Sequence, residues 1–529
     1  SRSGTPEGSA ATFAHGIASG DPDRTSVVLW TRVSGIEGPV DVDWLVASDS
    51  EFNDVVAMGR QTASESRDHT VKVVVEDLAP GGSWFYRFSV GETMSAVGRT
   101  KTLTDGHMDR LVIAVASCSN YPFGYFNAYD AIANDADVDV VAHLGDYIYE
   151  YSEDGYGGST GKRIGRVHEP RHEIVSLDDY RTRHAQYKSD EGSMAMHARH
   201  PLIAIWDDHE AANNPWMEGA ENHQPDEGDW FDRRAAALQA YYEWMPVRDP
   251  GPGQPLERYW RHYKFGDLAS LMTLESRHTG RSEQIYWGDL SRFESADDAQ
   301  AFYRDVIGAD DRNYLSAELE SFLAEAFAES VQANRRWRVI GNQSVMARVA
   351  MPRLDEPFFG ELRGRLDESG QRTIDSRRRM GELGVYGDLD AWGGYPVARE
   401  RFYQVAKDAG ASDLLVITGD SHSYWANALY DDEGQSMGVE LGTTGITSPR
   451  GLLALGPEGL ERYDQLTAEA NREVVWTDGQ YRGFIRLEID HDGAQANFVT
   501  ITDIESRDYE TRTVYTANIA SEDGELSYI

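Results

Sequence analysis

Short apolar runs that end in clusters of polar residues are the feature that most restricts how this chain can fold. After residue 106 such runs alternate with segments of helical periodicity, which is typical of βαβ units whose strands are buried on both faces of a sheet. The expected strands cover residues 111–117, 138–144, 202–206, 268–274, 337–340 and 414–418, and the clearest helices 231–244, 316–332 and 396–409. The segments 151–190 and 352–395, rich in Gly, Arg and Asp, are expected to be long loops.

The part of the chain before residue 104 has a different pattern. It consists of short β-branched and aromatic runs separated by turn residues, the spacing of an antiparallel sandwich. The expected strands cover residues 26–33, 40–47, 70–78, 83–90 and 95–103. Tyr86, near the start of one of them, resembles the tyrosine corner of fibronectin type III-like domains. We therefore expect a flexible N-terminus at 1–11, an all-β sandwich of the fibronectin or immunoglobulin type at 12–104, and an α/β domain at 107–529.

The charge of the chain excludes several classes of partner. With 50 Lys and Arg against 89 Asp and Glu, the formal net charge is −39. A field of this sign repels phosphate backbones and anionic membrane surfaces, so we expect no stable nucleic-acid binding. No apolar run reaches the roughly 18 to 20 residues of a membrane helix, so we expect no transmembrane segment. The first ten residues resemble a processed or tagged terminus, and we expect that an export signal has been removed.

Four of the expected strands lead into clusters of metal-ligating side chains. The clusters are Ser117-Cys118-Ser119-Asn120, Gly145-Asp146-Tyr147-Ile148-Tyr149, Trp206-Asp207-Asp208-His209-Glu210 and Gly419-Asp420-Ser421-His422. Each alone is weak evidence, because an Asp or His at a strand end is more often a turn cap and a lone buried cysteine is more often inert packing. The carboxyl ends of strands in open α/β sheets are, however, where ligands bind, so the four clusters are predicted to converge. Carboxylate, imidazole, phenol and thiol together suit a ferric ion beside a harder divalent ion.

These clusters and several further motifs resemble one known family. In chain order the motifs are Phe13-Ala-His-Gly-Ile-Ala-Ser-Gly-Asp-Pro22, Ser26-Val-Val-Leu-Trp-Thr-Arg32, Val115-Ala-Ser-Cys118, Leu144-Gly-Asp-Tyr-Ile-Tyr149, Trp206-Asp-Asp-His-Glu210, Ile340-Gly-Asn-Gln343, Asp390-Ala-Trp-Gly-Gly-Tyr-Pro396 and Gly419-Asp-Ser-His422. Their order and spacing are similar to those of PhoD-type alkaline phosphatases, a phosphatase and phosphodiesterase branch of the calcineurin-like metallophosphoesterases. The similarity covers nearly the whole chain. It implies that the α/β domain is a metallophosphoesterase fold, a two-sheet sandwich flanked by helices.

The resemblance also implies an iron site. Asp146 would bridge two metal ions, and Tyr149 would bind Fe³⁺ as a phenolate. Cys118 would be a thiolate ligand of the same iron, and His422 would complete the site.

The second metal site implied by the resemblance differs from that of more distant relatives. Asp208 and Asp420 stand where the wider superfamily carries an amide and an imidazole. Two carboxylates favour Ca²⁺, which prefers oxygen ligands, so the implied cofactors are Fe³⁺ and one or two Ca²⁺. Asn342 or Gln343 would supply a further carbonyl oxygen, with Asn342 slightly favoured.

Two residues are implied to contact the substrate. His209 matches the histidine that contacts the phosphoryl group and protonates the leaving oxygen in relatives; the alternative is that it only orients Asp208 through a hydrogen bond. Arg277 is a candidate to hold phosphate oxygens, although an arginine in so acidic a chain is more often ion-paired. Glu275 and Ser276 depart from the Asp-Thr that is more usual before this arginine, and the longer acid would shift its position.

The implied activity is hydrolysis of phosphomonoesters and phosphodiesters by metal-activated hydroxide, and the implied catalytic residues are Asp146 and His209. The resemblance also implies a secreted or periplasmic enzyme that recovers phosphate. The substrate is a small or polymeric phosphate ester. One alternative is a dedicated phosphodiesterase or phospholipase D. The other is a non-catalytic surface protein in which the metal site only stabilises the fold. The oligomeric state is not encoded in these motifs.

Overall fold

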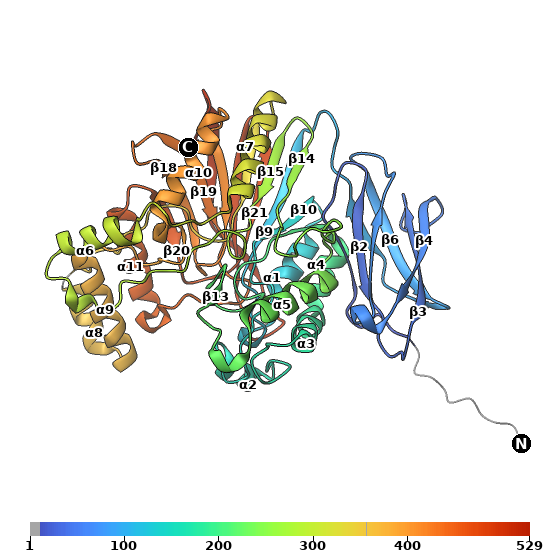
Figure 1. Cartoon of the computed structure of the whole chain (residues 1–529), viewed down its shortest axis with the longest axis horizontal. Helices are drawn as coiled ribbons and strands as arrows, with labels where there is room; N and C mark the ends of the chain where they lie inside the picture. Colours follow the sequence, from blue (N-terminus) through green and yellow to red (C-terminus); the bar gives the residue numbers. More distant parts are fainter. Residues whose placement is uncertain (1–10, 356) are drawn as a thin grey trace, which may run out of the picture.

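Two large β-sheets form the centre of the molecule (Figure 1). The structure is a computed structural model that describes residues 11–355 and 357–529, so the expected flexible segment 1–11 lies, except for its last residue, outside the described residues. The ten-stranded sheet has the order β24 (Glu525–Tyr528), β23 (Thr511–Glu522), β22 (Gly493–Ile501), β21 (Arg482–Asp490), β9 (Arg110–Ala116), β10 (Val140–His143), β11 (Leu202–Ala204), β1 (Ile17–Gly20), β2 (Val27–Arg32), β5 (Thr70–Val75). The seven-stranded sheet has the order β14 (His262–Phe265), β15 (Ala269–Thr273), β16 (Trp337–Gly341), β17 (Leu414–Thr418), β19 (Ser436–Gly442), β18 (Tyr424–Tyr430), β20 (Val474–Asp478).

The central strands of both sheets are parallel and buried on both faces. Strands β9, β10 and β11 pair in parallel, as do β15, β16, β17 and β19. Along β9 the side chains alternate, since successive residues of a strand point to opposite faces. Ile113 and Val115 pack between the two sheets, whereas Val112 and Ala114 pack against helices. Because both faces are buried, every residue of such a strand can be apolar, and the strands appear in the sequence as continuous apolar runs.

Helices cover the outer faces of the two sheets. The apolar cluster on the ten-stranded sheet includes residues of α1 (Asn127–Asn134), α3 (Leu177–Lys188), α4 (Glu191–Arg199) and α5 (Trp230–Trp244). The cluster on the seven-stranded sheet includes residues of α7 (Ala317–Gln332) and α10 (Pro396–Asp408). The predicted strands and the three predicted helices of this part agree with the structure to within a few residues. None of the described helices combines the length and apolar character needed to cross a membrane.

The N-terminal strands form two facing layers at one end of the molecule (Figure 1). The second layer is a sheet of β4 (Val55–Ala63), β3 (Val40–Ala47), β6 (Ser83–Val90) and β7 (Thr93–Met94), with β8 (Gly98–Lys101) also paired to β6. The first layer, β1, β2 and β5, continues into the ten-stranded sheet through a parallel pair between Gly20 and Leu202. The fibronectin- or immunoglobulin-like topology therefore stays a prediction, as do the domain boundaries. Strand β4 was not predicted; its alternate residues Val56, Met58, Arg60 and Thr62 are solvent-exposed, and only Ala63 of this strand is buried.

Tyr86 does not make the contact of a tyrosine corner. Its ring is fully buried, and its hydroxyl lies 3.5 Å from the carbonyl oxygen of His197 in α4, outside its own layer. Trp30 of β2 also reaches the α/β part, since its indole N–H donates to the carbonyl of Glu243 in α5 at 2.9 Å. Both aromatic side chains therefore attach the N-terminal layers to helices of the α/β part.

The prediction of long loops at 151–190 and 352–395 was wrong. The first segment contains α2 (Gly158–Ile164) and α3, and the second contains α8 (Phe358–Arg365) and α9 (Glu368–Leu383). Helix α9 is rich in charged residues, but the Asp367 carboxylate caps its N-terminus by accepting from the Gly370 N–H at 2.9 Å. Ile374 packs in an apolar cluster with α8 and α11 (Gly456–Ala470). Capping and tertiary packing thus stabilise a helix that the composition of the segment does not predict.

Among the remaining elements, α6 (Ala296–Phe302) lies at one edge of the molecule (Figure 1), and β12 (Pro215–Trp216) and β13 (Gly219–Ala220) form a short hairpin.

Candidate metal centre

Most of the predicted metal ligands follow the carboxyl ends of four strands, β9, β10, β11 and β17, and Asp208 is the one that follows β11. Cys118 follows β9, Asp146 follows β10, and Asp420 and His422 follow β17. All four have positive φ, at 62°, 54°, 61° and 55° respectively. Left-handed backbone is costly for residues with a Cβ and concentrates at functional sites. Strands β9, β10 and β17 therefore each end in a sharp turn that holds a ligating side chain over the edge of the sheet.

Asp146 is the common member of three groups of potential ligands. Within each group the candidate ligand atoms lie within 4.8 Å of one another. The groups are Cys118 with Asp146 and His422; Asp146 with Asp208 and His209; and Asp146 with Asp207, Asp208 and Asp420. The predicted convergence of the four strand ends is thus what the structure shows, and Asp146 is the residue at which the three groups meet.

On one side of Asp146 the donors are a phenol, a thiol and an imidazole. The Tyr149 hydroxyl donates to Asp146 Oδ2 at 3.1 Å and lies 3.4 Å from His422 Nε2. His422 Nδ1 donates to the carbonyl oxygen of Pro449 at 2.9 Å, which leaves Nε2 free to ligate. Burial lowers the pKa of His422 to about 3, so the ring is neutral as a metal ligand must be. Burial, followed by the charge of Asp146, raises the pKa of the Cys118 thiol.

On the other side of Asp146 lie the carboxylates of Asp207, Asp208 and Asp420, and not all of their oxygens have hydrogen-bond partners. Asp207 Oδ2 and Asp208 Oδ1 are buried and have no hydrogen-bond partner among the described residues. Burial and then the charges of Asp208 and Asp207 raise the pKa of Asp146. Burial and then Asp207 and Asp208 likewise raise the pKa of Asp420. Several carboxylates buried together cannot all ionise unless cations compensate their charge, so this cluster is suited to a metal ion.

His209 is held as a cation beside the cluster. Its Nδ1 donates to Glu150 Oε2 at 2.7 Å, and Nε2 lies 3.7 Å from Asp208 Oδ2. Burial alone lowers the pKa of His209, but the charges of Asp208 and Glu150 outweigh it and raise the pKa to about 9. The imidazole also stacks on Tyr149 with ring centroids 4.3 Å apart. Glu150 was not identified in the sequence, because its partner comes from a different strand end.

Arg277 lies at the same cluster, and two of the three nitrogen atoms of its guanidinium already donate to carboxylates. Its Nε donates to Asp207 Oδ1 at 2.6 Å and its Nη1 to Asp390 Oδ2 at 2.7 Å. Its Nη2 has no hydrogen-bond partner among the described residues and lies 3.8 Å from Asp208 Oδ1. Glu275 supports the same loop, since its Oε1 accepts from the Arg277 backbone N–H at 2.9 Å. Only Nη2 of this guanidinium is therefore available to a ligand.

The two candidate amides are both buried and hydrogen-bonded. Asn342 Oδ1 accepts from the Trp392 indole N–H at 3.1 Å, which leaves one of its two lone pairs. Gln343 Oε1 accepts from Ser276 Oγ at 2.8 Å, and its Nε2 donates to the carbonyl of Trp206 at 3.0 Å. The bonds of Gln343 fix it between strand ends, so Asn342 remains the better candidate.

Glu210 is a further residue that the sequence placed in a motif without a role. Its Oε1 accepts from the Tyr147 N–H at 2.6 Å, and its Oε2 accepts from the N–H groups of Asp146 at 3.1 Å and Asp207 at 2.9 Å. Burial raises the pKa of Glu210 to about 8. Glu210 therefore ties two ligand-bearing turns together.

Comparisons with known proteins identify the family of this chain. The model of the PhoD-like phosphatase family matches residues 113–498, and that of the PhoD-like phosphatase N-terminal domain matches residues 1–104. The chain is 34% identical over 502 residues to alkaline phosphatase D of Bacillus subtilis (strain 168), covering 92% of this chain and 76% of that protein. A solved structure described as the structure of PhoD superposes with a TM-score of 0.79 at 29% identity, covering 100% of this chain and 93% of the other. The chain belongs to the PhoD-like phosphatase family.

Proposed function

We propose that the chain hydrolyses phosphate esters, both monoesters and diesters, at the cluster around Asp146. Membership of the PhoD-like phosphatase family supports this activity. The single observation that carries the proposal is the buried cluster in which Asp207 Oδ2 and Asp208 Oδ1 lack partners among the described residues, beside a thiol, a phenol and an imidazole. A cluster of this kind is costly without cations and is suited to them.

The donor set fits two kinds of metal ion. Cys118, Tyr149 and His422 offer a thiolate, a phenolate and an imidazole, and with Asp146 they would hold Fe³⁺. The residues that would hold Ca²⁺ offer oxygen atoms only: Asp146, Asp208, Asp420 and, through its carbonyl, Asn342. Asp207, which the sequence analysis did not include among the ligands, offers a further free oxygen on this side.

The residues of the chain would orient the ester and move one proton. Bound metal ions polarise a phosphoryl group and make water a stronger nucleophile, which is the chemistry that they supply. His209, protonated and oriented by Glu150, gives the proton on Nε2 to the departing alcohol oxygen as the P–O bond breaks. Arg277, fixed by Asp207 and Asp390, presents Nη2 to a phosphoryl oxygen.

Several finer properties belong to the same proposal. The enzyme acts outside the cytoplasm and recovers phosphate, and its N-terminal layers at 12–104 form a fibronectin- or immunoglobulin-like domain that precedes the catalytic domain at 107–529. A dedicated phosphodiesterase or phospholipase D would use the same ligands, so it differs only in the preferred ester. A non-catalytic binding protein has no need of a His209 that Glu150 orients through Nδ1 and whose Nε2 lies 3.7 Å from Asp208 Oδ2 in the cluster.

The test is hydrolysis of a chromogenic bis-aryl phosphate and of the corresponding monoester. Activity is measured before chelation, after chelation, and after Ca²⁺ is restored. We expect chelation to remove activity and Ca²⁺ to recover it, and the ratio of the two rates gives the preferred ester. A protein that contains its metals and hydrolyses neither ester would favour the binding-protein alternative.

A further inference from the structure

A cavity of about 220 Å³ adjoins the metal centre on the side of β17 and β18. It lies between α9, α11 and the segments that follow β16 and β17. None of the ligand residues around Asp146 lines it. The cavity is therefore next to the centre rather than part of it.

One wall of the cavity comes from the turn that carries metal ligands. Ser421 and Ser423 line the cavity and flank His422 in sequence. Asp388 also lines it, and its Oδ1 accepts from the backbone N–H of Asp390 at 3.0 Å; Asp390 in turn binds Arg277. A group attached to a phosphate at the centre would thus pass this wall to enter the cavity.

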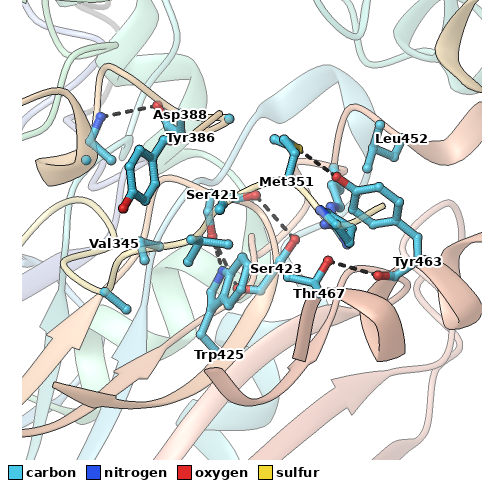
Figure 2. A pocket seen from close by; sticks show the side chains of 18 of the residues that line it. Val345, Met351, Tyr386, Asp388, Ser421, Ser423, Trp425, Leu452, Tyr463 and Thr467 are labelled. Atoms are coloured by element: carbon cyan, nitrogen blue, oxygen red, sulfur yellow. Dashed lines mark hydrogen bonds between the residues drawn. The ribbon is translucent and has the colours of Figure 1, made fainter. Parts of the chain in front are cut away.

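The two ends of the cavity differ in chemistry. Figure 2 shows Asp388 and Tyr386 on one side, Met351, Leu452 and Tyr463 on the other, and Trp425 between them. The Trp425 indole N–H donates to Ser421 Oγ at 2.8 Å, which fixes the ring along the cavity wall. Aromatic walls of this kind bind rings and alkyl groups through their faces.

A cation without an acidic partner stands at the Met351 end. Arg377 of α9 lines the cavity, and the contacts of its Nη1 are to the sulfur atoms of Met351 at 3.4 Å and Met380 at 3.7 Å. No carboxylate among the described residues lies within ion-pair distance of it. The other arginine of the cavity, Arg450, is paired with Asp464. In a chain of net charge −39, a partly buried arginine whose hydrogen bonds among the described residues go to sulfur atoms is available to an external anion.

We propose that this cavity binds the alcohol part of the phosphate ester and that Arg377 pairs with a second anionic group on that alcohol. The preferred substrates are then esters whose leaving group combines an aromatic or alkyl body with a second phosphate-like charge. The inference rests on the proposed function, because it assumes that the scissile phosphate sits at the Asp146 cluster. It adds to that function a class of substrate and a residue that selects it.

The test compares two monoesters that differ by one phosphonomethyl group, which carries the second charge. Phenyl phosphate lacks it, and 4-(phosphonomethyl)phenyl phosphate carries a phosphonate that the enzyme cannot cleave as an ester. In the metal-loaded enzyme, Arg377→Gln should lower kcat/KM for the phosphonate-bearing ester about tenfold, the usual effect of losing a charged hydrogen bond. It should leave kcat/KM for phenyl phosphate unchanged, and Arg377→Lys should recover part of the loss. The matched control is Arg372→Gln on the exposed face of the same helix, which should change neither ester.

The outcomes separate the cavity from the proposed function. Equal effects of Arg377→Gln on the two esters, or no effect on either, would overturn the assignment of the cavity. If the metal-loaded wild type hydrolyses neither ester, the proposed function is wrong, and calorimetric titration with benzylphosphonate then tests the cavity alone. Binding at least tenfold weaker in Arg377→Gln supports the cavity assignment, and equal binding rejects it.

Discussion

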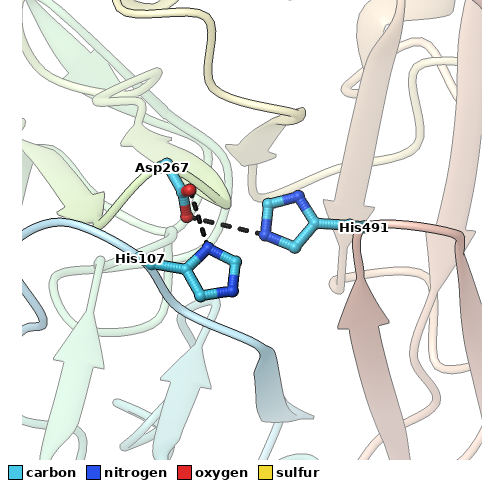
Figure 3. Close-up of side chains that lie close together, drawn as sticks. All are labelled: His107, Asp267 and His491. Atoms are coloured by element: carbon cyan, nitrogen blue, oxygen red, sulfur yellow. Dashed lines mark hydrogen bonds and ion pairs between the residues drawn. The ribbon is translucent and has the colours of Figure 1, made fainter.

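Potential metal ligands gather at two places in the described part of the chain, and only one of them combines burial with carboxylate oxygens that lack hydrogen-bond partners. The first is the cluster around Asp146. The second consists of His107, Asp267 and His491, which come from three connections at the other end of the central strands (Figure 3). In the first cluster the side chain of Asp208 is 2% exposed, whereas in the second that of His107 is 63% exposed.

Hydrogen bonding separates the two clusters more sharply than exposure does. His107 Nδ1 lies 2.9 Å from Asp267 Oδ2, and its Nε2 lies 3.0 Å from Asp109 Oδ1, so a protonated ring satisfies both carboxylates. His491 Nε2 lies 3.1 Å from the carbonyl oxygen of Met108, which commits this nitrogen to donating. Closeness of ligand atoms is therefore a poor criterion for a metal site. Buried carboxylate oxygens without partners, as around Asp146, are the better one.

The largest expected effect comes from the same substitution made in each cluster. Asp146→Asn removes the one carboxylate common to all three groups of ligands, and we expect turnover of an aryl phosphate to fall by about 10³-fold or more. Asp267→Asn should leave turnover unchanged. Steady-state kinetics of the two purified variants, with bound metal measured by elemental analysis, make the comparison. Unchanged turnover in Asp146→Asn would refute the assignment of the centre, and a large loss in Asp267→Asn would refute the contrast between the clusters.

A smaller loss is expected when the proton donor is removed and the ligands are kept. His209→Gln preserves the size and hydrogen-bonding capacity of the side chain but cannot transfer a proton, so kcat should fall about 10²-fold for esters with poor leaving groups. Esters whose leaving alcohol needs no proton should lose much less. The matched control is His491→Gln in the exposed cluster, with no expected effect on kcat. An equal loss for good and poor leaving groups would instead support the alternative in which His209 only orients Asp208.

The strand ends, and with them the positions of most candidate ligands, were predictable from the sequence for a local reason. A buried parallel strand has a continuous apolar run, and the polar residue that follows it lies at the edge of the sheet by topology alone. Cys118, Asp146 and Asp420 could therefore be placed together without knowledge of any side-chain contact. The left-handed backbone at these positions has no comparable signal, because the residues are not glycine.

The features that escaped prediction depend on contacts between distant segments. Glu150 orients the site only by accepting a hydrogen bond from His209, which lies far from it in the sequence. Arg277 donates to Asp207 Oδ1, and Asp207 Oδ2 has no hydrogen-bond partner among the described residues. The pairing of Gly20 with Leu202, which joins the N-terminal layers to the main sheet, is equally invisible in either segment alone. Such facts arise from the folded arrangement and not from local pattern.

A further difference between the clusters is expected in the visible spectrum. If Tyr149 binds Fe³⁺ as a phenolate, the enzyme absorbs visible light by charge transfer from the ring to the metal. Tyr149→Phe should abolish that band and reduce activity by about 10-fold to 100-fold, since Asp146 and His422 also lose a hydrogen-bond partner. His107→Gln should keep the band. Absorbance at equal iron content distinguishes the variants, and a band that survives Tyr149→Phe would exclude the phenolate.

The smallest expected effect is a pH-dependent change in stability at the exposed cluster. Hydrogen bonds to Asp267 and then Asp109 raise the pKa of His107 above its ordinary value of 6.5, and the bond from His107 lowers the pKa of Asp267 below 3.8. The stabilisation from His107 is therefore complete below pH 6.5 and is lost as the pH rises through the pKa of His107 in the folded state. The stabilisation from Asp267 is present above pH 3.8 and is lost as the pH falls through the pKa of Asp267 in the folded state.

The difference in Tm between wild type and His107→Gln should be greatest between these limits and vanish at alkaline pH. It should also shrink with added salt, because the pair is exposed. A Tm difference that instead persists at alkaline pH and grows when a divalent transition metal is added would show that the exposed cluster binds metal after all, and would remove the contrast with the buried one.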